Sequence, residues 1–231
     1  LIFLAARATE PPVVPHADRP AGLAVRRPGL LLVATALVMT GVIFGANEVI
    51  AIAYAEEEGA KTFSSIILGA FALGSTIAGL LFGTRIFRSS MTRRLLLAAA
   101  GMFVLEVPAL FVGGLWPLVV VMFIAGSATA PLLITSLSLA QRLVPKALVT
   151  EGMAVAITGI LIGISAGSAV AGWAIEAWGA QPAYVVPVVA GACALLIIAA
   201  RYRYLEGAEL AAAPEHTPTP ASAASTPTPA A

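Results

Sequence analysis

Long apolar stretches with almost no charged residues dominate the middle of this chain. Six of them lie between Leu30 and Ala200, and short connections separate them. Each has roughly the 20 residues that a helix needs to cross the hydrocarbon core of a bilayer. Because every backbone amide in lipid must find a partner within the protein, each stretch is predicted to be helical. The predicted spans are residues 30–53, 64–84, 95–112, 115–139, 152–175 and 183–200.

Composition strengthens this prediction. The mean hydropathy is +0.95, and charged residues make up 11% of the chain. They fall almost entirely outside the six stretches. The sequence therefore predicts an all-α membrane protein with six transmembrane helices, and we expect Pro131 to bend the fourth of them.

Basic residues mark one side of the predicted bundle. Of the 13 Lys and Arg residues, only Lys61 lies in a connection on the other side. Because cytoplasmic loops carry an excess of Lys and Arg, the positive-inside rule places both ends of this chain in the cytoplasm. We therefore expect a multi-pass protein of the cell inner (plasma) membrane.

The two ends differ in composition from the bundle at residues 30–205. Residues 1–7 are apolar up to Arg7, and they are interpreted as the end of a preceding transmembrane helix. Residues 8–29 contain five prolines and mixed charges, which is typical of a cytoplasmic linker. Residues 206–231 are rich in Ala, Pro, Thr and Ser and are predicted to be a disordered cytoplasmic tail. The alternative to a missing upstream half is a misplaced start on a free-standing six-helix protein.

Glycines predict how the helices pack. Gly159, Gly163 and Gly167 recur every four residues and share one face of the fifth helix, where they let another backbone approach closely. The second helix also carries four glycines. We therefore expect the second and fifth helices to be central and the sixth to face lipid. Close packing of helices alone explains most of these glycines. In a transporter the same glycine-lined faces would also let one helix slide against another.

The order of these elements resembles a known family. Six helices follow a basic linker, both ends lie inside, and an Arg-rich loop joins the second and third helices. This arrangement resembles the C-terminal half of a bacterial major facilitator superfamily transporter. The resemblance, which covers about residues 30–205, implies two inverted three-helix repeats and a missing N-terminal six-helix half. It also implies a substrate site between the two halves near the bilayer midplane.

A loop motif of that family survives in part. The family often has Gly-x-Leu-x-Asp-Arg-x-Gly-Arg-Arg after the second helix of a half, and this chain keeps the first glycine as Gly79 and the leucine. Gly83 stands at the acidic position and Thr84 at the following arginine. The loop thus lacks the acidic residue that could form a salt bridge in the family, but it keeps its positive charge. The basic residues concerned are Arg85, Arg88, Arg93 and Arg94.

Ionisable side chains within the apolar stretches are the candidate functional residues, because each costs about 2.5–3.5 kcal/mol to insert at a helix centre. Glu48, next to Asn47, lies in the first helix, which lines the central cavity in the family that the chain resembles. Its carboxylate is suited to take up a proton or to meet a cationic substrate. The alternative is that Glu48 reaches the outer water and has no role in transport.

Three other polar residues are further candidates. Glu106 lies two residues before Pro108 in the third helix. Its side chain is expected to reach outward or to bond a backbone group that the proline frees. Thr135 and Ser136 in the fourth helix offer hydroxyls to a substrate, or they bond the preceding turn of their own helix.

Several function classes lack the residues they need. The stretches contain no histidine, Cys193 stands alone, and no catalytic cluster appears, so no enzyme, metal or cofactor is predicted. The basic residues are too dispersed for nucleic acid. We expect a secondary transporter that works by alternating access, most simply as a proton-coupled antiporter that exports a small organic molecule. Uptake or facilitated passage of a sugar or metabolite is the alternative, as is a structural or regulatory membrane protein without transport activity.

Overall fold

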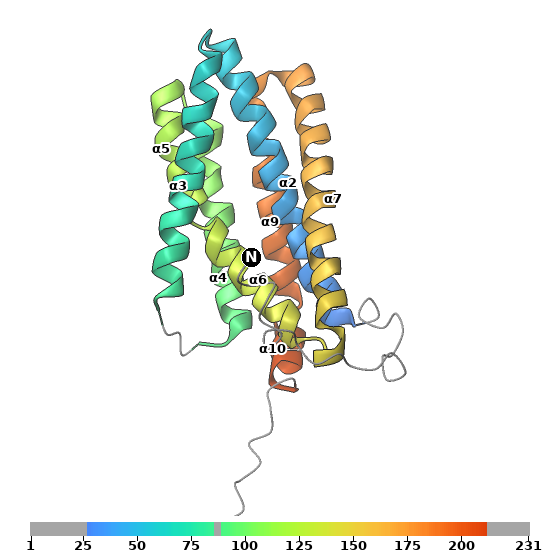
Figure 1. The fold of residues 1–231 in the computed structure, drawn as a ribbon. Coiled ribbons are helices and arrows are strands. Elements are labelled where there is room, and N and C mark those ends of the chain that lie inside the picture. Colours follow the sequence, from blue (N-terminus) through green and yellow to red (C-terminus); the bar gives the residue numbers. More distant parts are fainter. Residues whose placement is uncertain (1–26, 86–88, 212–231) are drawn as a thin grey trace, which may run out of the picture.

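The computed structural model describes residues 27–85 and 89–211 of the chain. In this part six helical spans are long and apolar enough to cross a membrane, which confirms the six predicted crossings. They run up and down side by side (Figure 1). The α-helices are α2 (Pro28–Glu57), α3 (Ser64–Gly83), α4 (Met91–Glu106), α5 (Leu115–Gly126), α6 (Thr129–Arg142), α7 (Val149–Trp178), α8 (Ala180–Ala183), α9 (Val185–Ala200) and α10 (Tyr202–Ala211). Short 3₁₀ segments occupy Lys61–Phe63, Val107–Phe111 and Lys146–Leu148.

Helix α2 forms the centre of the bundle. It lies between α3 and α7 in Figure 1, and it packs along both α7 and α9. In its most apolar stretch 61% of the residues are buried, compared with 17% in the span that contains α3. The span of α7 is likewise only 22% buried, so the prediction that the second and fifth helices are central is wrong for this bundle. The reason is that α3 packs mainly on α5 and leaves its other faces open.

Helix α9 also differs from the expectation. Its face at Ala190, Gly191 and Ala194 is buried, and a Cβ at Gly191 would lie 3.2 Å from the Cα of Phe103 in α4. Only its opposite face, with Val189 and Leu196, is exposed. The sixth crossing thus packs into the bundle on one face, and only its other face is open to lipid as expected.

Two pairs of helices touch backbone to backbone. In the α2–α7 pair, a Cβ at Gly41 would overlap the carbonyl oxygen of Ile160, and one at Gly163 would overlap that of Val38. In the α3–α5 pair, a Cβ at Gly74 or Gly126 would likewise overlap a carbonyl oxygen of the facing helix. The first helix of each three-helix repeat thus packs on the second helix of the other. This exchange is the pattern that two inverted repeats require.

Prolines interrupt two of the crossings. The fourth crossing breaks at Ser127–Ala128 between α5 and α6. The ring of Pro131 clashes with the carbonyl of the residue four positions earlier, which is Ser127, so the break lies where the predicted bend requires it. In the third crossing, Pro108 lies inside the 3₁₀ segment that follows Glu106.

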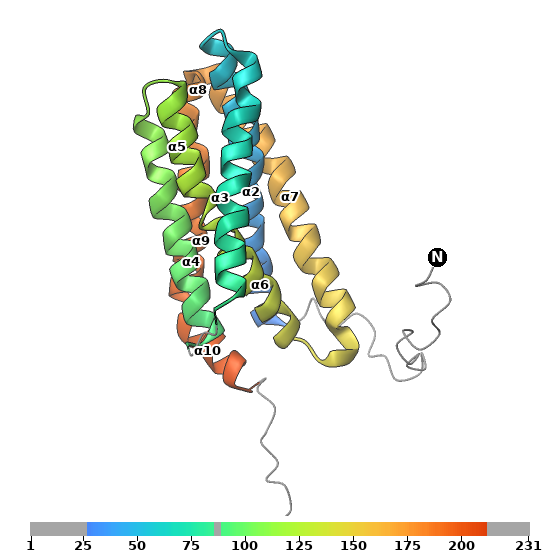
Figure 2. The ribbon, with the colours of Figure 1, turned by 60° about the vertical axis from the view of Figure 1, so that its left-hand side comes forward.

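The last helix corrects one boundary. The sequence predicts that the disordered tail begins at residue 206, but residues 206–211 belong to α10. Buried Leu205 anchors this helix to the bundle, and Glu209 bonds the start of α4. Figures 1 and 2 place α10 at the opposite end of the bundle from α8 and the α2–α3 turn. We call these the α10 end and the α8 end.

Candidate functional site

A cavity of about 400 Å³ opens on the face where α3 and α7 flank α2. Its walls are mostly apolar, and Phe44 of α2 meets Phe71 of α3 edge to face, with ring centroids 5.9 Å apart. The lining residues are Phe44, Asn47, Glu48, Leu68, Phe71, Ile160 and Ile164. A concave apolar site with a few polar groups is the usual form of a small-molecule pocket.

Glu48 and Asn47 are the polar side chains of this cavity. Glu48 is exposed to it, and within the described residues its carboxylate has no hydrogen-bond or ion-pair partner. Asn47 is only 2% exposed and forms part of the wall. Adjacent residues of an α-helix point about 100° apart, so one side chain faces the cavity while the other turns into the bundle.

Behind the cavity wall lies a buried carboxyl group. The Asn47 amide nitrogen Nδ2 donates a hydrogen bond to Oε1 of Glu106 at 2.5 Å. Glu106 is 0% exposed, so the prediction that it reaches outward or bonds the backbone near Pro108 is wrong. Helix α4 turns its Leu95, Ala99 and Met102 face inward, and Glu106 continues that face by one more turn.

Sequence reasoning missed this pair although a signal was present. The spacing of Leu95, Ala99, Met102 and Glu106 is four, three and four residues, which puts the carboxyl group on one stripe with the three apolar residues. Because nearly every position of this crossing is apolar, the pattern does not show which stripe faces the protein. Only the packing of α4 on α9 and α6 decides that.

A further polar group lies close to Glu106. Tyr184, which directly precedes α9, is 0% exposed, and its hydroxyl has no hydrogen-bond partner among the described residues. Tyr184 belongs to the same buried cluster as Ala109, three residues after Glu106, and nearby Gln181 donates a hydrogen bond to the Ala109 carbonyl oxygen at 3.0 Å. The hydroxyl of Tyr54 accepts a hydrogen bond from the Gly114 backbone at 2.8 Å. Towards its α8 end the bundle therefore encloses a polar cluster of Asn47, Glu106 and Tyr184.

The hydroxyls predicted in the fourth crossing do not join this site. Thr135 and Ser136 lie in α6, at 2% and 1% exposure, and neither lines the cavity. Within the described part of the chain neither hydroxyl has a hydrogen-bond partner, so the expected bond to the preceding turn is not made either. Both side chains are enclosed by helices rather than presented to a ligand.

The loop residues lie elsewhere as well. Gly79 belongs to α3, where a Cβ would come within 3.1 Å of the Ala130 side chain. Arg85 and Arg93 are exposed at the α10 end, and Arg94 is half-buried there. Arg88 lies outside the described residues. None of the described residues of this loop lines the cavity that holds Glu48.

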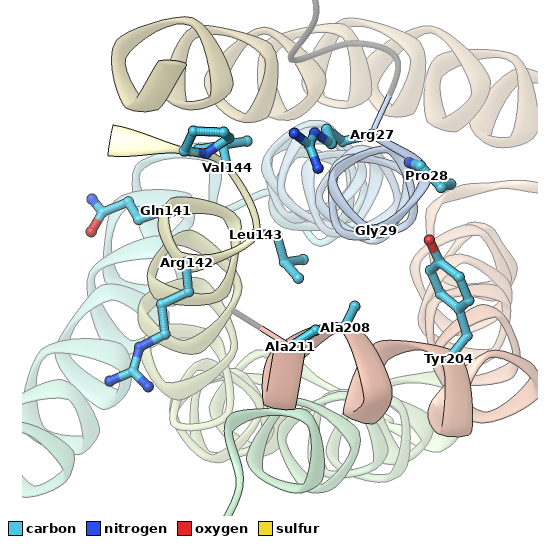
Figure 3. Close-up of a pocket in the computed structure, with 11 residues that line it drawn as sticks. Arg27, Pro28, Gly29, Gln141, Arg142, Leu143, Val144, Tyr204, Ala208 and Ala211 are labelled. Carbon is cyan, nitrogen blue, oxygen red and sulfur yellow. The ribbon is translucent and has the colours of Figure 1, made fainter. Parts of the chain in front are cut away.

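A second, open cavity of about 640 Å³ lies at the α10 end, between the start of α2, the end of α6 and α10 (Figure 3). Gly29, Leu143 and Ala208 surround it, and the hydroxyl of Tyr204 points towards the start of α2. The side chain of Arg142 extends away from it in this view. Glu48 lies about 30 Å from this end along α2, at 1.5 Å per residue, so the two cavities are separate.

Comparison with known proteins identifies one family. A family model described as Major Facilitator Superfamily matches residues 30–229. No curated protein and no solved structure matches the chain. The matched range contains all six membrane-length helices except the first two residues of α2, and it contains the whole cavity around Glu48.

Proposed function

The chain belongs to the major facilitator superfamily of membrane transporters, and from this premise we propose that it exports a small organic solute in exchange for protons. The cavity around Glu48 is the observation that carries the proposal. It combines an apolar wall, which suits an organic molecule, with an exposed carboxylate that can exchange a proton or attract a cation. Its lining side chains come from α2, α3 and α7, and in Figure 1 the latter two helices flank α2.

The proposed mechanism is alternating access between two six-helix bundles. A second bundle would pack against the open face, so that the cavity becomes the midplane site between the halves. Two exposed aliphatic side chains of α7 support this arrangement. Ile157 and Leu161 lie one turn from Ile160 and Ile164, which line the cavity, so the apolar surface continues beyond it. The partner bundle is proposed to be the N-terminal half of the same transporter.

Orientation and location are part of the proposal. We place the α10 end in the cytoplasm and the bundle in the inner (plasma) membrane. The distribution of charge supports this placement, since Arg85, Arg93 and Arg142 lie at the α10 end. Lys61, which pairs with Glu56 at 3.2 Å, lies at the other end. In this placement the apolar helix faces contact lipid, and the end with most of the basic residues lies in the cytoplasm.

The test uses the intact transporter in energised inside-out vesicles, with a dye that reports the proton gradient. Ethidium serves as a cationic probe and a neutral hexose as the alternative. Export coupled to protons predicts that ethidium collapses part of the gradient and that Glu48→Gln reduces this response at least tenfold. Glu176→Gln, which alters an exposed glutamate in α7, serves as the matched control and should leave the response unchanged.

Two results would contradict the proposal. A normally folded Glu48→Gln protein with unchanged coupling removes Glu48 from the mechanism. Hexose flux that ignores the gradient would favour facilitated passage of a sugar instead.

A further inference from the structure

We infer that Glu106 is a second protonation site, sealed inside the bundle and reached from the cavity through Asn47. The link to transport rests on the proposed function, but the existence of the site does not. The proton would pass from a hydronium ion in the cavity to the Glu106 carboxylate, leaving water and a neutral carboxylic acid. The reverse step would return it, and no other bond changes.

The burial of Glu106 is the first support. The residue is 0% exposed, and the amide of Asn47 is its one hydrogen-bond partner within the described residues. No cation in the described part of the chain forms an ion pair with it. An ionised carboxylate without a counter-charge in such surroundings is very unfavourable, whereas the neutral acid is tolerated. The geometry therefore suits a carboxyl group that carries a proton.

Unpartnered polar atoms around Glu106 are the second support. Among the described residues three buried atoms of this cluster have no hydrogen-bond partner: Oε2 of Glu106, Oδ1 of Asn47 and the hydroxyl of Tyr184. Asn47 already bonds Oε1 of Glu106, whereas the Tyr184 hydroxyl, which could donate to Oε2, makes no such bond. An ionised carboxylate would therefore keep one buried oxygen without a donor, which is costly. The unpartnered Oε2 thus favours a carboxyl group that carries a proton.

The other ionisable groups near the site are few. Helix α2 brings Tyr54 and, on the cavity side, Glu48, while the α8–α9 junction brings Tyr184. The basic residues of α4 lie in its first turn, at the far end from Glu106. Among the described residues, no other charged side chain lies beside Glu106 in the enclosed part of the bundle.

Asn47 provides the route. It belongs to the wall of the cavity, and it also bonds Glu106, so a single side chain separates the carboxyl group from the space that a solute or water would fill. In this route a change of the Asn47 rotamer would break its bond to Glu106 and open the path. Asn47 carries no proton itself and is a positioning residue.

Infrared spectroscopy tests the inference on the intact transporter in lipid. A protonated carboxylic acid has a carbonyl band apart from those of amides and carboxylates. We expect such a band in the wild-type protein and expect Glu106→Gln to remove it, while Glu48→Gln and Glu176→Gln keep it. If Glu106→Gln does not fold, Asn47→Ala supplies the answer, because loss of the hydrogen bond to Oε1 shifts the band to higher frequency.

Each outcome of the infrared experiment either supports or overturns the inference about Glu106. A spectrum of Glu106→Gln identical to that of the wild type, or a band that Asn47→Ala does not move, overturns the inference. So does a band that disappears in Glu48→Gln alone, since the proton then resides in the cavity. Wild-type flux that does not depend on the proton gradient refutes the proposed function but leaves the infrared result standing. If both hold, Glu106→Gln should flatten the pH profile of transport.

Discussion

In this bundle the role of a single residue depends on the atoms that directly surround it. Glu48 and Glu106 are both glutamates within apolar helices, yet one faces an open cavity and the other is enclosed. Glycines show the same dependence on position. Gly163 touches the backbone of α2, whereas Gly172, nine residues further along α7, has no neighbour within 4 Å of where a Cβ would stand.

These two glycines form a matched pair for mutation. Gly163→Ala forces a methyl group onto the Val38 carbonyl oxygen, so α2 and α7 must separate. Overpacking of this kind typically costs about 1–3 kcal/mol. Gly172→Ala meets open space and should be neutral or slightly stabilising. Thermal unfolding of the purified protein in detergent compares the two, and equal melting temperatures would show that the close α2–α7 contact does not matter for stability.

At the scale of elements, α10 is joined to α4 by one carboxylate. Oε1 of Glu209 accepts from the Met91 backbone at 2.8 Å, and Oε2 accepts from the Thr92 backbone at 2.9 Å and from its hydroxyl at 2.8 Å. Ser90 accepts from the Arg93 backbone at 3.3 Å. Together they satisfy backbone donors that the first turn of α4 cannot bond itself. The helix after the last crossing is therefore part of the folded bundle.

The pH dependence of this contact follows from its hydrogen bonds. Partial burial acts to raise the pKa of the Glu209 carboxyl, but the bonds from Thr92 and Met91, with help from Arg142, hold the pKa below its ordinary value of 4.5. A pKa that folding lowers gives stability that is present above the unfolded pKa and is lost as the pH falls through the folded one. We expect α10 to loosen only below about pH 4.5.

Hydrogen-exchange protection factors measure this loosening. Glu209→Gln should lower protection in α10 and in the first turn of α4 at neutral pH, because a cap is typically worth about 0.5–2 kcal/mol. Glu206→Gln is the control, since Glu206 accepts only from Tyr202 within the same helix, at 3.3 Å. Equal protection in both variants would mean that other contacts hold α10 in place.

At the scale of the whole molecule, the two inverted repeats make a bundle with one covered side and one open side. Helix α9 packs on α2 and α4 packs on α9, which covers one side. On the other side α3 and α7 flank α2 (Figure 1), and residues of these three helices line the cavity. A symmetric up-and-down bundle would have no such difference between its sides. The open side gives the proposed partner bundle its place.

The sidedness of the bundle can be measured with single cysteines. In a Cys193→Ser background, Glu58→Cys lies in the exposed α2–α3 turn and Thr84→Cys in the exposed end of α3. An impermeant maleimide should label Glu58→Cys in intact cells and Thr84→Cys only in inside-out vesicles. The opposite result would invert the proposed orientation, and labelling of both from one side would contradict an odd number of crossings between them.

The size of the native polypeptide tests the proposed second bundle. An antibody against the segment around Glu215 should detect a band of about twice 23.5 kDa in native membranes. A single transporter chain with two six-helix halves has this size. A band at 23.5 kDa would refute the proposal that the partner bundle is part of the same chain.

The sequence by itself determined the six crossings, the break near Pro131 and the side that carries the positive charge. These depend on the length, apolarity and charge of local segments. Such properties decide whether a segment enters lipid or stays in water, whatever the other helices do. It also singled out Gly163 and Glu48, because spacing and an isolated charge are local properties. Only the tertiary structure decided which face of each helix is inside. It put α2 rather than α3 at the centre, enclosed Thr135 and Ser136, and brought Glu106 against Asn47. The physical reason is that lipid and protein interior are equally apolar, so hydrophobicity in a membrane helix does not distinguish the buried face from the exposed one.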